Sequence, residues 1–442
     1  MKKAFYFIFL LIFSVSCSFD NKTGIWKNDN QVTKKSNDIF KEFKTLSTES
    51  EVFKKIQPIK KNYKFKLSSS RNVSQWSDIY SSDNNSFKHF KYKNLNNIIF
   101  KSKKITKHKI NKYILYENEN VILSDQKGNL IIFSLNENQI IRKINFYKKK
   151  HKKIKKILNY IIENNIIYVS DNLGYLYAYD YNKDQILWAK NYKVPFRSNL
   201  KIFKNKLIAV DQSNKLIIIN KDKGVTYRSV PTEETTIKNK FINNLSMNNR
   251  SIYLLNTYGS LYSLNKQSMR ANWFLNFNQS IDINPSNLFQ GNEIINNNEV
   301  IVITSNNTTY ILDAFTGSTL YKKNFTSVIK PLLIDNYLFL ITKNSLLIAL
   351  NVNDGKIIYS YDINQKISEF LDTKKKTATF KQVMMIDEKI FIFLKNSYIL
   401  KFNVNGTLEE IIKLPSKLNT YPMIIDNTLL YLNYKNKLFI VN

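Results

Sequence analysis

The chain has 442 residues, and 67 Lys or Arg against 34 Asp or Glu give it a formal net charge of +33 at pH 7. With 43% hydrophobic and 14% aromatic residues it is too apolar for a disordered polycation. Nine glycines and seven prolines exclude collagen-like and Gly/Pro-rich classes, and a single cysteine excludes an internal disulfide, a Cys-based zinc site and an iron–sulfur ligand set.

The N-terminus has the pattern of an export signal. Two lysines precede the apolar run 4–15, which Ser16 and Cys17 follow. About a dozen apolar residues are too few for a membrane-spanning helix, which needs roughly 20. The segment resembles a bacterial lipoprotein signal, which implies that residues 1–16 are the signal peptide and that Cys17 is lipidated. Ser18 replaces the Asp that is typical of inner-membrane retention and favours the outer membrane. An ordinary secreted protein with an incidental cysteine is the alternative.

Residues 17–75 are rich in Lys, Asn, Ser and Thr and show little periodicity. Their apolar residues are too sparse to offset the entropy of ordering the segment alone. We expect a flexible tether that could dock onto another surface.

Residues 76–442 contain a repeat of four apolar strands separated by Gly or Asn turns. One turn position marks each copy, at spacings of 38 to 52 residues. Gly and Asn tolerate the positive φ of a tight hairpin turn. The repeat predicts an all-β fold, an eight-bladed β-propeller of four-stranded antiparallel blades. The markers are Gly128, Gly174, Asn214, Gly259, Asn307, Ser345, Ser397 and Asn436.

A second column, about fourteen residues past the marker, is mostly aromatic. A stacking platform for a ligand is one interpretation, and packing of each blade on the next is the favoured one. The column holds Arg142, Trp188, Tyr227, Trp273, Tyr321, Tyr359 and Ile411.

The eighth copy supplies only three strands before the chain ends. We expect the N-terminal segment Phe87–Phe100 to provide the fourth. Pairing the N- and C-terminal strands would close the ring and remove the sheet edges that an open array exposes.

The residues offer little for catalysis. The histidines are His89, His108 and His151, none at a paired metal-ligand spacing, and no Gly-rich phosphate loop is present. Asp residues near strand ends (Asp171, Asp180, Asp211 and Asp313) have a turn role in the repeat. We therefore expect no catalytic residue, no metal site and no cofactor.

The positive charge raises the possibility of nucleic-acid binding. The lysines are spread through the chain, apart from the run 148–153 and the trio 374–376, and an exported protein does not meet nucleic acid. We expect no nucleic-acid partner. Attraction to anionic lipid is physically plausible.

The units GYLYAYDYNKDQILW, TTYILDAFTGSTLY and SLLIALNVNDGKIIY resemble the repeat of pyrroloquinoline-quinone-type propellers. On a lipoprotein, this repeat resembles the BamB family of outer-membrane protein assembly factors. Quinone-dependent dehydrogenases are similar in fold but carry an adjacent-cysteine disulfide, which one cysteine cannot form. The resemblance therefore implies a non-enzymatic scaffold, without cofactor, anchored in the outer membrane and facing the periplasm.

The same resemblance implies binding to the periplasmic domains of the central assembly protein BamA, and possible contact with unfolded outer-membrane proteins. The family's contact loop has the pattern apolar-x-apolar-Arg, which Val194, Phe196 and Arg197 match. An inter-blade linker whose apolar residues only pack is the alternative for this loop. A ligand-binding or dehydrogenase propeller and an envelope adhesion lipoprotein remain open as alternative functions.

Overall fold

The computed structural model describes residues 18–19, 26–27, 53–233, 242–277, 294–305 and 307–442. The chain forms two compact units, 1–51 and 52–442. In the first unit, β1 (Ser18–Phe19) pairs antiparallel with β2 (Trp26–Lys27). The predicted signal peptide and Cys17 lie outside the described residues. Among the described residues, no helix combines the length and apolar character that crossing a membrane would require.

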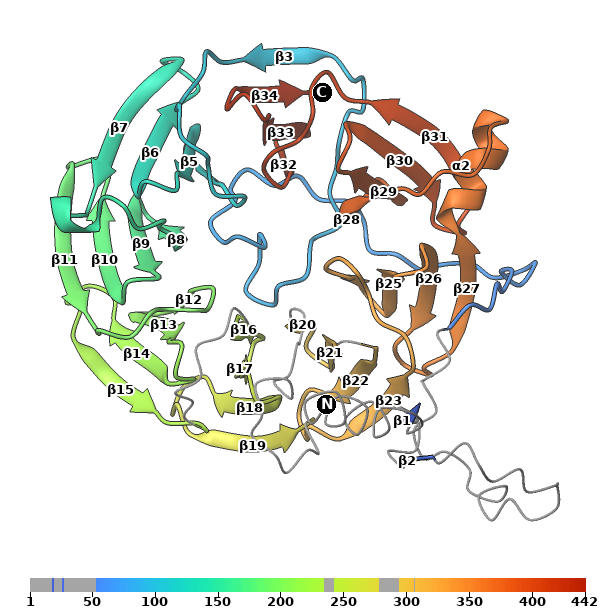
Figure 1. Ribbon diagram of the computed structural model, residues 1–442, viewed down its shortest axis with the longest axis horizontal. Helices are drawn as coiled ribbons and strands as arrows, with labels where there is room; N and C mark the ends of the chain where they lie inside the picture. The colour runs from blue at the N-terminus through green and yellow to red at the C-terminus, as the bar shows by residue number, and fades with distance from the viewer. Residues whose placement is uncertain (1–17, 20–25, 28–52, 234–241, 278–293, 306) are drawn as a thin grey trace, which may run out of the picture. The chain divides into compact units, whose positions relative to one another are not determined.

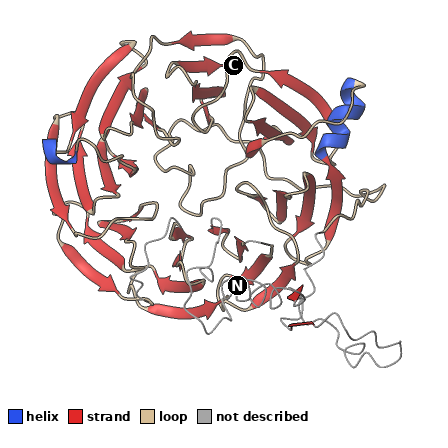
Figure 2. Ribbon diagram, viewed as in Figure 1, coloured by secondary structure: helices blue, strands red, loops and turns tan. Residues whose placement is uncertain are grey.

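The second unit is a ring of eight four-stranded antiparallel blades, which confirms the predicted propeller (Figures 1 and 2). Within each blade we count the strands from the axis outward. Blades 1 to 4 are β4 (Leu115–Glu117), β5 (Asn120–Ser124), β6 (Asn129–Ser134) and β7 (Gln139–Asn145); β8 (Leu158–Glu163), β9 (Ile166–Asp171), β10 (Tyr175–Asp180) and β11 (Gln185–Asn191); β12 (Lys201–Phe203), β13 (Lys206–Val210), β14 (Leu216–Asn220) and β15 (Thr226–Val230); and β16 (Asn244–Met247), β17 (Ser251–Leu255), β18 (Ser260–Asn265) and β19 (Ala271–Asn276). Blades 5 to 7 are β20 (Ile294–Asn296), β21 (Val300–Thr304), β22 (Thr309–Asp313) and β23 (Thr319–Lys323); β24 (Leu332–Ile334), β25 (Tyr337–Ile341), β26 (Leu346–Asn351) and β27 (Ile357–Asp362); and β28 (Phe380–Ile386), β29 (Lys389–Leu394), β30 (Tyr398–Asn403) and β31 (Leu408–Lys413).

The eighth blade joins the two ends of the chain. It consists of β32 (Met423–Ile425), β33 (Thr428–Leu432), β34 (Leu438–Val441) and, as its outer strand, β3 (Ile98–Lys101). Ring closure by terminal strands is therefore confirmed. The closing strand is shorter than the predicted segment 87–100, because residues 87–97 do not form a strand.

The core lies between the blades. The second and third strands are almost fully buried, as in β25 and β26 of blade 6, because neighbouring blades cover both of their faces. The outer strands alternate between exposed and half-buried positions. The 3-10 turn η1 (Lys149–His151) and helix α2 (Ile363–Leu371) lie in connections between blades.

In five blades the turn between the second and third strands is capped by an Asp or Asn side chain. In blade 2, Oδ1 of Asp171 accepts the backbone N–H groups of Leu173 (2.9 Å) and Tyr175 (2.8 Å). Seven of the eight marker residues have positive φ, between 56° and 92°, which confirms their turn role. The eighth, Asn307, directly follows residue 306, and residue 306 lies outside the described residues. The capping residues equivalent to Asp171 in blades 1, 3, 4 and 8 are Asp125, Asp211, Asn256 and Asn433.

Three rings of the aromatic column pack on the next blade, as the favoured interpretation predicts, whereas Tyr227 is 67% exposed. Trp188 of β11 lies against Gly224 in blade 3, where an added Cβ would come within 2.6 Å of the indole. Its Nε1 donates to the carbonyl of Lys221 at 2.7 Å. Equivalent pairs are Trp273 with Gly317 and Tyr321 with Gly355.

Residues 73–92, called the plug here, lie across the axis of the ring (Figure 1). The plug is hydrogen-bonded to all eight blades, although it forms no named strand. Trp76 stacks on Phe90 at its centre, with ring centroids 5.6 Å apart. In blade order the bonds are Tyr116 N to Trp76 O (3.0 Å), Ile162 N to Ser77 O (3.0 Å), Lys201 Nζ to Ser82 O (3.0 Å), Met247 N to Asp83 O (2.9 Å), Asn296 N to Asn84 O (3.1 Å), Ser86 Oγ to Leu333 O (2.5 Å), Phe90 N to Met385 O (3.0 Å) and Asp426 N to Val73 O (2.9 Å).

Residues 53–72, which belong to the predicted tether, lie against blades 6 and 7. Gln57 exchanges two backbone hydrogen bonds with Ser360 of β27, at 2.8 and 3.0 Å. Phe65 packs edge-on against Tyr337, with ring centroids 4.8 Å apart. Residues 53–72 are therefore docked on the propeller, a position that the sequence had allowed for the tether.

Candidate functional site

The meander order of the strands gives the ring two different faces. The turns between first and second strands and between third and fourth strands lie on one, here the hairpin face. The turns between second and third strands share the other, the connection face, with the segments that link one blade to the next. The plug leaves a cavity at each face.

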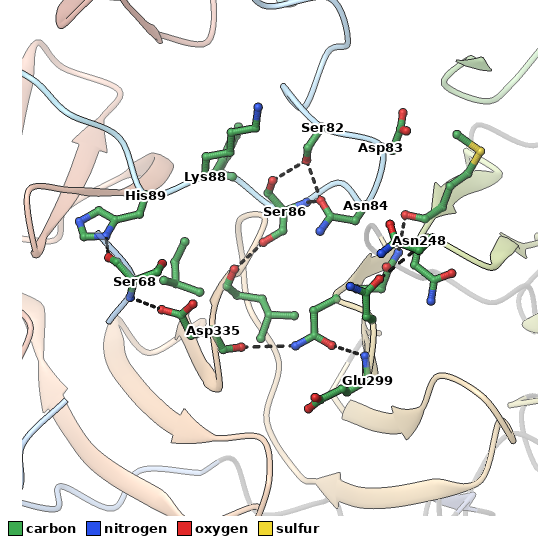
Figure 3. Close-up of a pocket in the computed structure, with 18 of the residues that line it drawn as sticks. Ser68, Ser82, Asp83, Asn84, Ser86, Lys88, His89, Asn248, Glu299 and Asp335 are labelled. Atoms are coloured by element: carbon green, nitrogen blue, oxygen red, sulfur yellow. Dashed lines mark hydrogen bonds between the residues drawn. The ribbon is translucent and has the colours of Figure 1, made fainter. Parts of the chain in front are cut away.

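The cavity on the hairpin face has a volume of about 710 Å³ and lies between the plug and the turns of blades 4 to 6. Figure 3 shows that its polar side chains are largely bonded to one another or to nearby backbone. Ser82 Oγ lies 2.8 Å from Asn84 Oδ1, and Asp335 Oδ2 accepts the N–H of Ser68 at 2.7 Å. These bonds hold the plug and the docked segment in place.

His89 lines this cavity, but both of its ring nitrogens are engaged. Nε2 accepts the backbone N–H of Glu388 at 2.8 Å, so Nδ1 carries the proton and donates to the carbonyl of Ser68 at 2.6 Å. The side chain is buried. It fixes the plug to blade 7 and leaves neither nitrogen for proton transfer or metal binding.

The Asp residues that sequence reasoning singled out all cap turns. Asp180 and Asp313 each accept two backbone N–H groups within their own turns, as Asp171 and Asp211 do. Burial raises the pKa of Asp171, whereas the Thr316 N–H and hydroxyl hold the pKa of Asp313 below its usual value. No group of three or more His, Cys, Asp or Glu side chains in the described part of the chain could hold a metal ion.

The quinone of the dehydrogenases that share this repeat does not fit these residues. The resemblance implies two adjacent cysteines against the quinone and a calcium site built on a carboxylate. The chain has one cysteine, and the strand-end aspartates bind their own turns. We derive no reaction step through that cofactor.

The predicted partner loop lies on the connection face, between blades 2 and 3. Phe196 is 1% exposed and packs edge-on against Tyr192, with ring centroids 5.4 Å apart. Its backbone N–H donates to the carbonyl of Asp171 at 3.0 Å. Val194 and Arg197 are half-buried, and Arg197 Nη2 donates to Gln212 Oε1 at 3.3 Å. Phe196 therefore anchors the loop, and only Val194 and Arg197 present surface to a partner.

The connection face also carries most of the concentrated basic charge. The link 102–114 into blade 1 has five lysines, the link 146–157 into blade 2 has seven, and neither has Asp or Glu. The hairpin face mixes both signs, with acidic residues such as Glu119, Glu299 and Asp335 in its turns. The sequence hides this asymmetry, because residues from the two faces alternate along the chain every few positions.

A second cavity, called the connection-face pocket here, has a volume of about 500 Å³. Its floor is formed by the plug, and its walls come from the links into blades 1, 6 and 8 and from the start of β28. Tyr113 and Tyr421 stack in one wall, with centroids 4.8 Å apart and planes 24° apart. Five lysines line the pocket, and the described residues around it include no Asp or Glu: Lys109, Lys112, Lys330, Lys381 and Lys395. Sequence reasoning missed this group because its members come from four separate segments.

The fold and the closed axis define the class, an eight-bladed propeller with repeats of the pyrroloquinoline-quinone type. Residues 148–361, just under half of the chain, match the family described as outer membrane protein assembly factor BamB, so the resemblance is confirmed over blades 2 to 6. A comparison with curated proteins finds no match.

Solved structures show how widely this fold is used. BamB from Moraxella catarrhalis has 12% identity and a TM-score of 0.59, covering 77% of this chain and 99% of that one. The computationally designed protein Ika8 has 11% identity and a TM-score of 0.59, covering 78% of this chain and 99% of that one. The quinohemoprotein alcohol dehydrogenase from Comamonas testosteroni has 9% identity and a TM-score of 0.60, covering 84% of this chain and 81% of that one. At such identities the likeness concerns the fold alone, which an assembly factor, a designed protein and an enzyme share.

Proposed function

We propose that this chain is a non-enzymatic scaffold of the machinery that assembles β-barrel proteins in the outer membrane. The family match across blades 2 to 6 carries the proposal. The engaged nitrogens of His89 and the turn-capping role of the Asp residues support binding over catalysis. In this role the ring holds the periplasmic domains of the central assembly protein, BamA, and meets unfolded outer-membrane proteins.

The proposed contact is the loop between blades 2 and 3. Val194 and Arg197 would meet the partner, while the backbone N–H of Phe196 fixes the loop to the blade 2 turn and its buried ring packs on Tyr192. Burial lowers the pKa of Arg197, but an arginine stays charged at neutral pH. Among the described residues Gln212 accepts one bond from this half-buried guanidinium, which has further donors for a partner carboxylate.

The same proposal places the protein on the periplasmic side of the outer membrane. Lipidation of Cys17 would supply the anchor after removal of residues 1–16. A Cys17→Ala variant should then lose the acyl chains, and fractionation would find it released from the membrane.

Binding to the periplasmic domains of the cognate BamA tests the scaffold role. The chain without residues 1–17 is titrated at low and at near-physiological salt, beside Arg197→Glu and the matched control Arg250→Glu on the hairpin face. We expect saturable binding that survives salt, is lost in Arg197→Glu and is retained in Arg250→Glu. Equal loss in both variants, or binding that disappears at moderate salt, would reduce the interaction to non-specific charge attraction.

A further inference from the structure

The connection-face pocket has the size and lining of a ligand site. Its volume of about 500 Å³ falls within the roughly 300–1,000 Å³ that is typical of small-molecule pockets. Apolar side chains, among them Ile79, Ile114 and Met423, cover much of its wall. Plug residues line its floor, and its walls open on the connection face.

The charged groups in this pocket are held against rings. Lys330 Nζ lies 3.7 Å from the ring centroid of Tyr80 and 4.1 Å from that of Phe87. Lys381 Nζ lies 5.3 Å from the ring centroid of Tyr421 and donates to the carbonyl of Asn419 at 2.8 Å. Such positions keep the ammonium groups inside the pocket instead of in bulk water.

Lys112 and Lys395 lie close enough to Lys381 to repel it, and the described residues that line the pocket include no Asp or Glu. Burial, together with the nearby charges of Lys112 and Lys395, lowers the pKa of Lys381 to about 8. The lysine-rich link 102–114, on the same face, adds further positive charge around the entrance. An anion entering the pocket would remove this repulsion and would be drawn towards it from solution.

We propose that the connection-face pocket binds an organic anion with an aromatic body, whose carboxylate is neutralised by Lys381 and Lys112 and whose ring packs against the tyrosine wall. The ring requirement follows from the wall, because an inorganic anion would leave Tyr113, Tyr421 and the aliphatic side chains uncovered. This chemistry occurs in free aromatic acids and in polypeptides that end in an aromatic residue.

Calorimetric titration of the full-length protein with two pairs of ligands, each a carboxylate and its neutral amide, tests the proposal. The first pair is 2-naphthoate and its neutral isostere 2-naphthamide, which represent a free aromatic acid. The second is N-acetylphenylalanine and N-acetylphenylalaninamide, which represent a carboxyl terminus. We expect at least one anion to bind at least tenfold more tightly than its amide, and the anion that binds identifies the source. No binding of either anion, or equal binding of acid and amide, would overturn the proposal.

Two variants assign the binding to these residues. Lys381→Met should weaken binding of the anion at least tenfold, and Lys112→Gln, at an exposed position, should weaken it severalfold without disturbing the fold. Lys152→Met is the control, since this exposed lysine belongs to the same face but not to the pocket. Equal weakening in Lys152→Met, or unchanged binding in both pocket variants, would place the anion elsewhere and refute the site.

Discussion

The buried ion pair between the plug and blade 3 offers the sharpest test of how the axis is closed. Lys201 Nζ lies 2.8 Å from Asp78 Oδ2, with side-chain exposures of 0% and 6%. In the Lys201→Met variant Asp78 stays buried without its cation, and the carbonyl of Ser82 loses a donor. Breaking a buried pair in this way costs about 3–5 kcal/mol. Because about 1.4 kcal/mol corresponds to a factor of ten, the plug should open roughly 10²- to 4 × 10³-fold more often.

Hydrogen exchange at blade amides that donate to the plug measures this opening directly. The N–H groups of Ile162, Met247 and Asn296 should exchange faster in Lys201→Met than in the parent, while amides within the middle strands change less. A double variant with Asp78→Asn should recover at least half of the loss, because the amide removes the buried charge and its oxygen can still accept the N–H of Tyr80.

The matched control is the exposed pair Lys356–Asp354, with 3.7 Å between Nζ and Oδ2. Lys356→Met should change the stability by less than about 1 kcal/mol. If Lys201→Met lowers the stability no more than Lys356→Met does, or if the double variant is as unstable as Lys201→Met alone, the buried pair does not hold the plug.

Three further predictions concern stability, each measured by urea unfolding. Gly224→Ala should cost more than about 1–2 kcal/mol, because φ is +67° and the Cβ meets the indole of the preceding blade, whereas Ser397→Gly at φ 92° should gain about 0.5 kcal/mol; equal effects would contradict the turn argument. Burial raises the pKa of Asp171, so its contribution to the free energy of unfolding is full below the pKa of the unfolded state and is lost as pH rises through the pKa of the folded state. The stability of Asp171→Asn should therefore rise relative to that of the parent between pH 4 and 7. A stability difference that does not change with pH would contradict this. Because the pKa of Lys381 is lowered to about 8, the folded state loses stability as pH falls through this value. Lys381→Met should therefore be more stable than the parent by about 1–2 kcal/mol at pH 7, and by progressively less from pH 8 towards 10. A stability difference independent of pH would refute the assignment.

The fold was predictable because most blades repeat one local rule. In these blades a buried strand ends at Asp or Asn, a residue with positive φ turns the chain, and the next strand is again buried, as in 166–180. These are short-range signals, so eight imperfect copies reinforce one another in the sequence. Ring closure followed from counting strands, since the last copy has three.

The plug and the connection-face pocket were not predictable on the same grounds. The plug bonds to each blade through single groups that lie up to about 350 residues apart in the chain, and neither its strand content nor its spacing repeats. The lysines of the pocket lie at positions 109, 112, 330, 381 and 395, and only closure of the ring brings them together. At the partner loop the sequence left two alternatives open, a contact loop and a linker whose apolar residues only pack, and the burial of Phe196 agrees with packing for this residue.

The blades and the links between them are under different structural constraints, and this difference explains where both proposed binding sites lie. A blade residue contacts neighbours on two sides, so a change of shape there disturbs two interfaces. A link only has to join one outer strand to the next inner strand, and its surface side is free to vary. The Arg197 loop lies in one such link, and the pocket draws three of its four tyrosines and four of its five lysines from links and turns on this face. Because a designed protein, an assembly factor and a dehydrogenase share this ring, what distinguishes this chain is to be sought in its plug and its links.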